Sequence, residues 1–296
     1  MKTPSLLRHC RLFIVSSAAI LATQLCASAA ILHIDERFDG PGYTVGESIP
    51  NGGQNPWLFS RGVNQPAPLP IVLETPEDKY DRKPTATHAM YLLRPSGTDL
   101  SAQYRTAYAP AGLTPLVLKA DTTYEWSFDY LQSSGFNIIF LDTGANRPFA
   151  SLSINGSNQL AYLTDGNTGT ATGSRTPARD GDNNIITVEN DVWYTFSLSM
   201  QLHKGVGTDP ATVDYSFSIT ALGADDPLFA ISLTDVATAA DFTSDVRMLL
   251  SPQGSVDAYM TNIRLATIPE ADTAQLLLGG GLALALFLFH TRRKMA

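Results

Sequence analysis

The feature that most limits what this chain can fold into is a strict alternation of apolar and polar side chains in three long segments. In residues 124–130, 194–202 and 213–219, every second residue is aromatic or aliphatic and the residues between are polar. Successive side chains of a β-strand point to opposite faces, so this period of two puts one face in a core and the other in water. We therefore expect three long strands, the last two joined as a hairpin across residues 203–209.

Shorter segments with the same character surround these three. Within the body, residues 30–267, the only helix that the sequence predicts is a brief one over Asp235–Phe242, and residues 51–70 and 166–184 are expected to be exposed loops. Many short strands without helical crossovers predict an all-β fold, an antiparallel β-sandwich, which is a jelly roll if the first and last strands meet. Further strands are predicted at residues 30–38, 88–93, 136–141, 149–154, 159–163, 185–188, 246–250 and 256–265.

The N-terminus has the pattern of an export signal. Three basic side chains within the first eleven residues precede an apolar stretch at residues 12–25. Ala27 and Ala29 then give the small–x–small pattern that signal peptidase cuts, which predicts a signal peptide over residues 1–29. The alternatives are an uncleaved anchor and lipidation at Cys26, although the residues before Cys26 lack the small side chain that lipidation needs.

The C-terminus has a second apolar segment, followed by Arg292, Arg293 and Lys294. The 14 residues from Leu276 to Phe289 include no polar side chain, whereas a core helix would show a polar face. A bilayer span needs about 20 apolar residues, so the segment is short for one. We predict a membrane helix over residues 274–290 with the basic end, residues 291–296, in the cytoplasm and the body outside. A buried core helix is the alternative.

Pro269 and Glu270 stand directly before this segment. The combination of a Pro-Glu motif at residues 268–272, a hydrophobic helix and a basic end resembles the PEP-CTERM sorting domain of exosortase substrates in Gram-negative bacteria. Ala271 departs from the family pattern, which has a second proline there. The resemblance implies that residues 268–296 form a sorting tail. It also implies an exosortase-type partner, which takes the protein from the inner membrane to the cell surface or the exopolysaccharide matrix.

The body between the two ends, residues 30–267, is acidic and free of cysteine. Six of the 20 basic residues and two of the 28 acidic ones lie outside it, which leaves a net charge of about −12. Such a charge argues against nucleic acid as a partner and leaves room for Ca²⁺. Both cysteines lie in the signal, so the body has no disulfide, no cysteine metal site and no cysteine nucleophile. Its length fits one all-β domain.

Three stretches of the body resemble a known fold family. Residues 35–46 with Trp57, residues 192–196 and residues 256–265 are similar to the opening, a central strand and the closing strand of concanavalin A-like lectin/glucanase and laminin G-like sandwiches. The resemblance covers about a sixth of the chain. It implies the sandwich fold and leaves the activity open.

A cation site is one hypothesis for the acidic turn at residues 180–184. Oxygens of Asp180, Asp182 and Asn184 stand at alternate positions and could converge on Ca²⁺, which prefers oxygen ligands. An EF-hand is not predicted, because the sixth position of the loop is Ile185 rather than glycine. The alternative is a turn stabilised by its own Asx side chains.

Carbohydrate chemistry suggests two further sets of residues. Glu125 and Asp129 lie four apart on one strand, about 13 Å, whereas glycosidase carboxylates lie about 5–10 Å apart. A solvated strand face is therefore the preferred interpretation, and no catalytic residue is predicted. Trp57 and Tyr43 lie in loop-like sequence and could stack on sugar rings, with core packing as the alternative.

Taken together, the sequence favours an exported surface or exopolysaccharide-matrix protein, and favours a non-enzyme over an enzyme. No resident cofactor is predicted beyond the Ca²⁺ hypothesis. A carbohydrate-binding, lectin-like module is the first alternative, with extracellular polysaccharide as its partner. A polysaccharide-degrading enzyme is the second.

Overall fold

The computed structural model describes the body of the chain, Ile31–Thr267, and little beyond it. The predicted signal peptide with Ala27 and Ala29, the motif Pro269 and Glu270, the membrane helix and the basic end all lie outside the described residues. Within the part of the chain that is described, no helix is long and apolar enough to cross a membrane. The described residues are 30–50, 56–61, 68–94, 100–105, 116, 119–132, 135–142, 147–166, 174–207, 209–238, 246–252 and 256–268.

The described unit consists of β-strands joined by turns and loops, as the alternating sequence predicts. The strands are β1 (Ile31–Glu36), β2 (Trp57–Arg61), β3 (Ile71–Glu74), β4 (His88–Arg94), β5 (Leu100–Arg105), β6 (Thr122–Gln132), β7 (Phe136–Asp142), β8 (Arg147–Ile154), β9 (Leu160–Asp165), β10 (Ser174–Pro177), β11 (Trp193–His203), β12 (Ala211–Ala221), β13 (Phe229–Thr238), β14 (Val246–Pro252) and β15 (Val256–Ile268).

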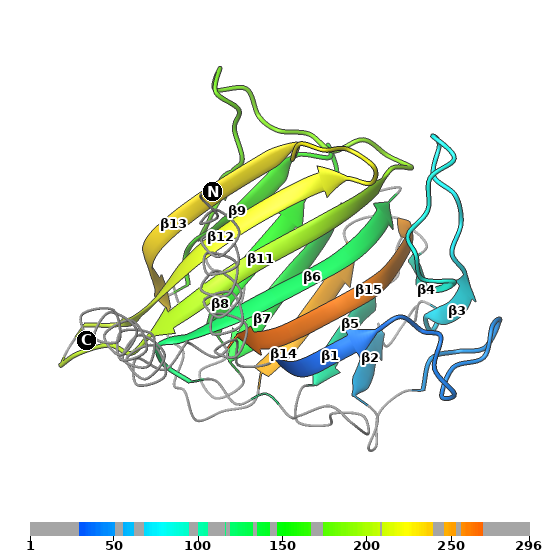
Figure 1. Cartoon of the computed structure of the whole chain (residues 1–296), viewed down its shortest axis with the longest axis horizontal. Coiled ribbons are helices and arrows are strands. Elements are labelled where there is room, and N and C mark those ends of the chain that lie inside the picture. The colour runs from blue at the N-terminus through cyan, green and yellow to red at the C-terminus, as the bar shows by residue number, and fades with distance from the viewer. Residues whose placement is uncertain are drawn as a thin grey trace, which may run out of the picture. The chain divides into compact units, whose positions relative to one another are not determined.

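The strands form two sheets that pack face to face (Figure 1). The eight-stranded sheet has the order β13-β12-β11-β6-β15-β4-β3, with β1 also paired to β15, and the seven-stranded sheet has the order β10-β9-β8-β7-β14-β5-β2. The recorded pairings of these strands are antiparallel, and Ile31 of the first strand lies opposite Thr267 of the last. The predicted all-β antiparallel sandwich is confirmed, including the meeting of first and last strands.

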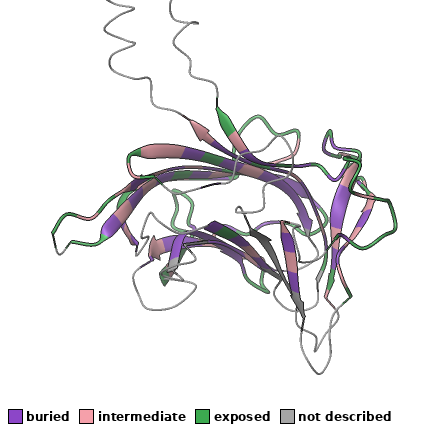
Figure 2. Cartoon of the chain, turned by 90° about the horizontal axis from the view of Figure 1, so that it is seen from below, coloured by how far each residue is buried: buried purple, intermediate pink, exposed green. Residues whose placement is uncertain are grey.

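The core lies between the sheets, and Figure 2 shows that strands of both sheets carry buried positions. Phe128 of β6 stacks on Phe196 of β11, with ring centroids 4.6 Å apart. Trp126 of β6 meets Phe140 of β7 edge to face at 4.5 Å, so the two sheets are joined by aromatic contacts. Such rings bury large apolar areas, which a domain without disulfides needs for its stability.

The predicted helix over Asp235–Phe242 is wrong where the structure describes it, because residues 235–238 belong to β13. Asp235 has a positive φ of 55°, and its N–H donates to the carboxylate of Asp214 on β12 at 2.8 Å. The β12–β13 pairing is irregular at this point. This local kink interrupts the period of two, which is why the segment does not resemble a strand in the sequence.

Three other predictions need correction at the level of elements. Residues 185–188 form isolated bridges, from Ile185 to Arg179 and from Thr187 to Gln159, instead of a strand. The expected loop over 166–184 includes β10, which pairs with β9, and the expected loop over 51–70 includes β2, which pairs with β5. The position of β2 at the end of the seven-stranded sheet places Trp57 inside the sandwich rather than on an exposed loop.

Candidate functional site: a serine trough on the outer sheet face

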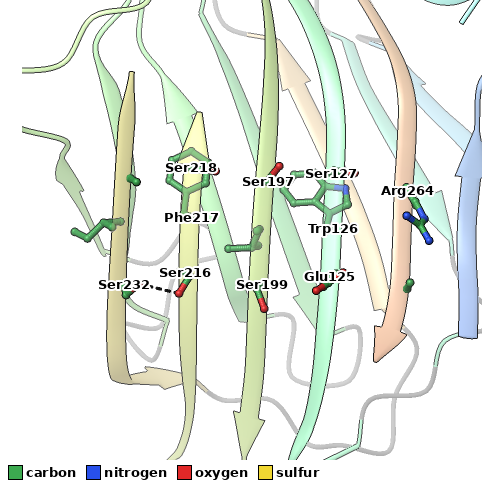
Figure 3. A pocket seen from close by; sticks show the side chains of 14 residues that line it. Glu125, Trp126, Ser127, Ser197, Ser199, Ser216, Phe217, Ser218, Ser232 and Arg264 are labelled. Atoms are coloured by element: carbon green, nitrogen blue, oxygen red, sulfur yellow. Dashed lines mark hydrogen bonds between the residues drawn. The ribbon is translucent and has the colours of Figure 1, made fainter. Parts of the chain in front are cut away.

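The outer face of the eight-stranded sheet has a hollow floored by small polar side chains (Figure 3). Its serines come from four neighbouring strands, β6, β11, β12 and β13, and its far side is lined by Arg264 and Ala266 of β15. We call this hollow the serine trough. Its serines are Ser127, Ser197, Ser199, Ser216, Ser218 and Ser232, and Glu125 and Ala230 complete the same face.

Strand register places these side chains in two straight rows. In the first row Ser197 lies directly opposite Ser127 on one side and Ser218 on the other. In the second row Ser199 lies opposite Glu125 and Ser216, and Ser216 lies opposite Ser232. Directly opposite residues on neighbouring strands have Cβ atoms about 5 Å apart, so the rows form a regular grid of hydroxyl groups.

The trough has a volume of about 620 Å³, within the usual range of ligand sites. Ser216 and Ser232 share a hydrogen bond of 2.8 Å between their hydroxyls. The hydroxyls of the other four serines form no hydrogen bond with another described residue. Each hydroxyl can both donate and accept a hydrogen bond, so the floor offers mixed donors and acceptors to a ligand.

Of the two carboxylates considered in the sequence, only Glu125 lies in the trough, where it is exposed. Asp129 lies further along β6 and is buried, accepting hydrogen bonds from Thr195 and Asn262 at 2.6 Å each. Burial raises the pKa of Asp129, although these two hydrogen bonds oppose the rise. The two carboxylates therefore occupy different environments and do not form a catalytic pair.

The trough continues along the strands into a second hollow of about 210 Å³. This hollow shares Ser199, Ser216 and Ser232 with the trough and adds Gln201 and Asp214. The combined surface is elongated, and its polar groups are mostly uncharged.

An aromatic pair lies on the same outer face, where β4 meets β15. Tyr91 and Tyr259 lie directly opposite each other, with ring centroids 4.9 Å apart. Both side chains are partly exposed, while the residues on either side of Tyr259 point into the core. Burial and a hydrogen bond with Asp257 raise the pKa of Tyr91 to about 12, so its hydroxyl stays protonated. Amphipathic rings of this kind can pack against apolar faces of a ligand.

The predicted Ca²⁺ ligands Asp180, Asp182 and Asn184 form a turn stabilised by its own side chains. Asp180 Oδ1 accepts from the N–H groups of Asp182 and Asn184 at 3.0 and 2.8 Å, and Oδ2 accepts from Asn184 Nδ2 at 3.1 Å. These hydrogen bonds lower the pKa of Asp180. Nowhere in the described ranges do three or more His, Cys, Asp or Glu side chains gather as a metal site would require. The turn matches the Asx alternative.

Trp57 and Tyr43, the predicted sugar-stacking residues, are brought together, but not as an exposed platform. Trp57 is 1% exposed and stacks on Phe59 at 5.8 Å, so stacking of its indole on a sugar from solvent is excluded by burial. Tyr43 is partly buried, and its hydroxyl donates to Glu36. Core packing, the alternative reading, is the role that the structure gives to Trp57.

Neither the serines of the trough nor the tyrosine pair was predicted from the sequence as a functional site. A signal for the serines was present, because the polar positions of residues 197–199 and 216–218 are serine alone, without the charges usual on a solvated strand face. The pairing of Tyr91 with Tyr259 depends on the meeting of β4 and β15, which only the fold shows.

No protein-family model and no curated protein sequence matches the chain. Similar solved structures include the T. cruzi calreticulin globular domain, with 10% identity, a TM-score of 0.46, and coverage of 90% of this chain and 100% of that chain. A lectin from Bauhinia forficata in complex with GalNAc has 11% identity, a TM-score of 0.40 and coverage of 81% and 98%. A marine PL-14 alginate lyase from Aplysia kurodai has 10% identity, a TM-score of 0.39 and coverage of 61% and 83%. These neighbours are lectin-like and alginate lyase sandwiches, and similarity this low assigns neither a ligand nor a reaction.

Proposed function

We propose that this chain is an exported, non-catalytic protein that binds uncharged polysaccharide on the outer face of its eight-stranded sheet. The observation that carries the proposal is the serine trough, in which serine hydroxyls lie in registered rows across neighbouring strands, four of them without a hydrogen bond to any other described residue. A hydroxyl-rich polymer can exchange hydrogen bonds with such a grid. The elongated form of the hollow favours a chain over a compact ligand.

The charges around the trough support an uncharged ligand. Glu125 and Arg264 contribute one charge of each sign, so the trough itself has no net charge. The acidic body as a whole repels anionic polymers, which disfavours both nucleic acid and strongly acidic polysaccharide. The tyrosine pair on the same face supports the proposal as a further contact surface for sugar rings.

The termini support export and association with the matrix. The signal-like residues 1–29 and the PEP-CTERM-like tail at residues 268–296 favour passage through the inner membrane and delivery by an exosortase-type enzyme to the surface or the exopolysaccharide matrix. Polysaccharide binding by the body would then retain the protein in that matrix after the tail is processed.

A pull-down of the full chain, extracted in detergent, on insoluble neutral polysaccharides tests this proposal. The Ser197→Trp substitution fills the centre of the trough from an exposed position and should reduce the bound fraction at least fivefold. Ser157→Trp, on the exposed turn after β8, is the matched control and should bind as the unaltered chain does. Release of reducing sugar that is lost on Glu125→Gln would instead favour the degradative alternative.

A further inference from the structure

A separate hollow lies where β1 ends and β2 begins, apart from the serine trough and its extension. Its volume is about 570 Å³, and the residues that matter for its chemistry are Glu36, Phe38, Asp39, Tyr43, Pro50 and Trp57. We call it the Glu36 cleft. Its wall is largely aromatic and proline-rich, and its polar side chains are three carboxyls, the guanidinium of Arg37 and the phenol of Tyr43. That combination suits a ligand with both apolar faces and hydroxyl groups.

The carboxyl of Glu36 is the unusual group in this cleft. The side chain is 5% exposed, and Tyr43 donates its hydroxyl to Oε2 at 2.5 Å. Burial raises the pKa of Glu36 to about 7, although its interactions with Tyr43 and the Trp57 indole oppose the rise. In the described part of the chain no cation pairs with it. A buried carboxyl that stays protonated near neutral pH can donate a hydrogen bond, which an ionised one cannot.

The surrounding charges are acidic overall. Arg37 lies beside Asp35, with 3.5 Å between Nε and Oδ1, so its charge is partly neutralised there. Asp39 accepts from His88, with 2.9 Å between Nδ1 and Oδ1. The opposite partner of Glu36 on β15 is Ile263, which does not titrate. The charged and titratable side chains next to Glu36 in the cleft are Asp35, Arg37, Asp39 and Tyr43.

The backbone holds this arrangement in a strained conformation. Phe38 has a φ of 58°, in the left-handed region that bulky residues rarely adopt. Its ring is buried, lies edge-on to Tyr43 at 5.2 Å and is 6.1 Å from Trp57. These contacts fix the segment after β1 over the cleft. The wall is thus formed before any ligand arrives, which lowers the ordering cost of binding.

We propose that the Glu36 cleft binds a single uncharged sugar unit, such as a chain end, through the Glu36 carboxyl and the ring of Tyr43. The inference rests on the proposed polysaccharide-binding function and adds a second, chemically distinct subsite to it. Uronate units are disfavoured, because three carboxyls and one guanidinium line the cleft. A sugar seated over Glu36 removes the remaining water from the carboxyl, which favours its protonated form. Binding and proton uptake are therefore linked, and affinity falls as the pH rises through about 7.

The test measures binding of a panel of neutral tetrasaccharides, namely cellotetraose, maltotetraose and mannotetraose, to the full chain with Ser197→Trp, so that the trough is closed. For the tightest of the three, affinity should be about tenfold higher at pH 6 than at pH 8, because the protonated fraction of Glu36 falls by that factor. Adding Glu36→Gln, which keeps a neutral donor, should abolish the pH dependence. Adding Glu47→Gln, an exposed site outside the cleft, should leave it unchanged.

Failure of this inference can be told apart from failure of the proposed function. If closing the trough removes all tetrasaccharide binding, or if the remaining binding does not change between pH 6 and pH 8, the Glu36 subsite is refuted while the trough stands. If the chain binds equally with and without Ser197→Trp, the trough is refuted. The pH series needs no change in the cleft, so a Glu36→Gln chain that did not fold would leave the test intact.

Discussion

The buried carboxyl of Glu36 makes the stability of the whole protein depend on pH. Among the described residues, no cationic side chain pairs with it. Its folded-state pKa of about 7 exceeds the ordinary glutamate pKa of 4.5, so the folded state holds the proton more tightly than the unfolded chain does. Stability from this group is fully present below pH 4.5 and declines as the pH rises to about 7. The total loss is about 3 kcal/mol.

Glu36→Gln should therefore change stability only on the alkaline side. At pH 8 we expect the variant to be more stable than the unaltered chain by up to about 3 kcal/mol, and at pH 4.5 the two should differ little. Urea unfolding at both pH values measures the free energy of unfolding. An equal difference at pH 4.5 and pH 8 would contradict a raised pKa at this residue.

At the residue scale, local structure could be predicted from the sequence better than burial could. The sequence correctly marked Asp180 and Asn184 as members of one turn, because Asx side chains bond to backbone groups two to four residues away. It placed Trp57 on a loop because Gly, Pro and Asn surround it. Burial of Trp57 depends on β2 joining the seven-stranded sheet, a long-range pairing that leaves no local pattern.

At the scale of elements, the long strands were predictable and the short edge strands were not. β6, β11 and β12 are long enough for their alternation to be unmistakable, and their register then creates the rows of the trough. The short strands β3 and β10 lie at the edges of their sheets. Each has only one neighbouring strand among those described, so their sequences show less regular alternation of apolar and polar residues. The trough itself needed the strand order, because the sequence does not show that β6 lies between β11 and β15.

One acidic side chain joins the turn after β3 to the start of β11. Asp78 is buried and accepts from the N–H groups of Tyr80, Arg82 and Trp193, at 2.8, 3.0 and 3.2 Å, and from Arg82 Nε at 3.1 Å. Burial raises its pKa, but the hydrogen bonds outweigh that effect, and the net pKa is lowered. The ionised carboxylate of Asp78 therefore stabilises the fold fully above the unfolded-state pKa of about 3.9. This stabilisation is lost as the pH falls through the lower folded-state pKa.

Asp78→Ala should destabilise the fold by about 3 kcal/mol at pH 7, because it leaves the buried N–H of Trp193 and the guanidinium of Arg82 without their acceptor. Thermal unfolding followed by circular dichroism measures this change in the stability of the fold. Asp226→Ala, at an exposed position between β12 and β13, serves as the control and should shift stability by less than about 0.5 kcal/mol. A loss no larger than that of the control would show that the hydrogen bonds of Asp78 do not stabilise the fold.

The contact between the two sheets can be tested at the centre of β11. Phe196 is fully buried and contacts Phe128 and Phe217 of its own sheet and Phe136 of the other. Phe196→Ala should cost about 4 kcal/mol, through lost burial and the cavity left behind. Ser197→Ala, the next residue and on the outer face, should cost little, and equal losses for both would contradict the inward and outward assignment of β11.

At the scale of the whole molecule, the distribution of charge and apolar segments favours a body that acts outside the cytoplasm. The body is acidic and cysteine-free, and two apolar segments flank it. The fold of the body could be predicted from the period of two and the many short strands in its sequence. The route of export stays a prediction, because the residues that would show it lie outside the described part of the chain.

Removal of residues 269–296 tests the proposed route. We expect the truncated protein to leave the membrane fraction and appear in soluble exported fractions, because it lacks the apolar segment that would hold it in the inner membrane. Cell fractionation followed by immunoblotting measures this distribution, and replacement of Arg292, Arg293 and Lys294 by glutamine is a milder variant that keeps the apolar segment. An unchanged distribution after truncation would count against the sorting tail.

The central claim is that a neutral glycan binds in the serine trough, and a crystal structure of the full chain with its tightest neutral oligosaccharide tests it most directly. We predict sugar density over the rows of Ser197 and Ser199, with ring oxygens or hydroxyls within about 3 Å of serine Oγ atoms. Density confined to other surfaces, with the trough filled only by solvent at saturating oligosaccharide, would contradict it.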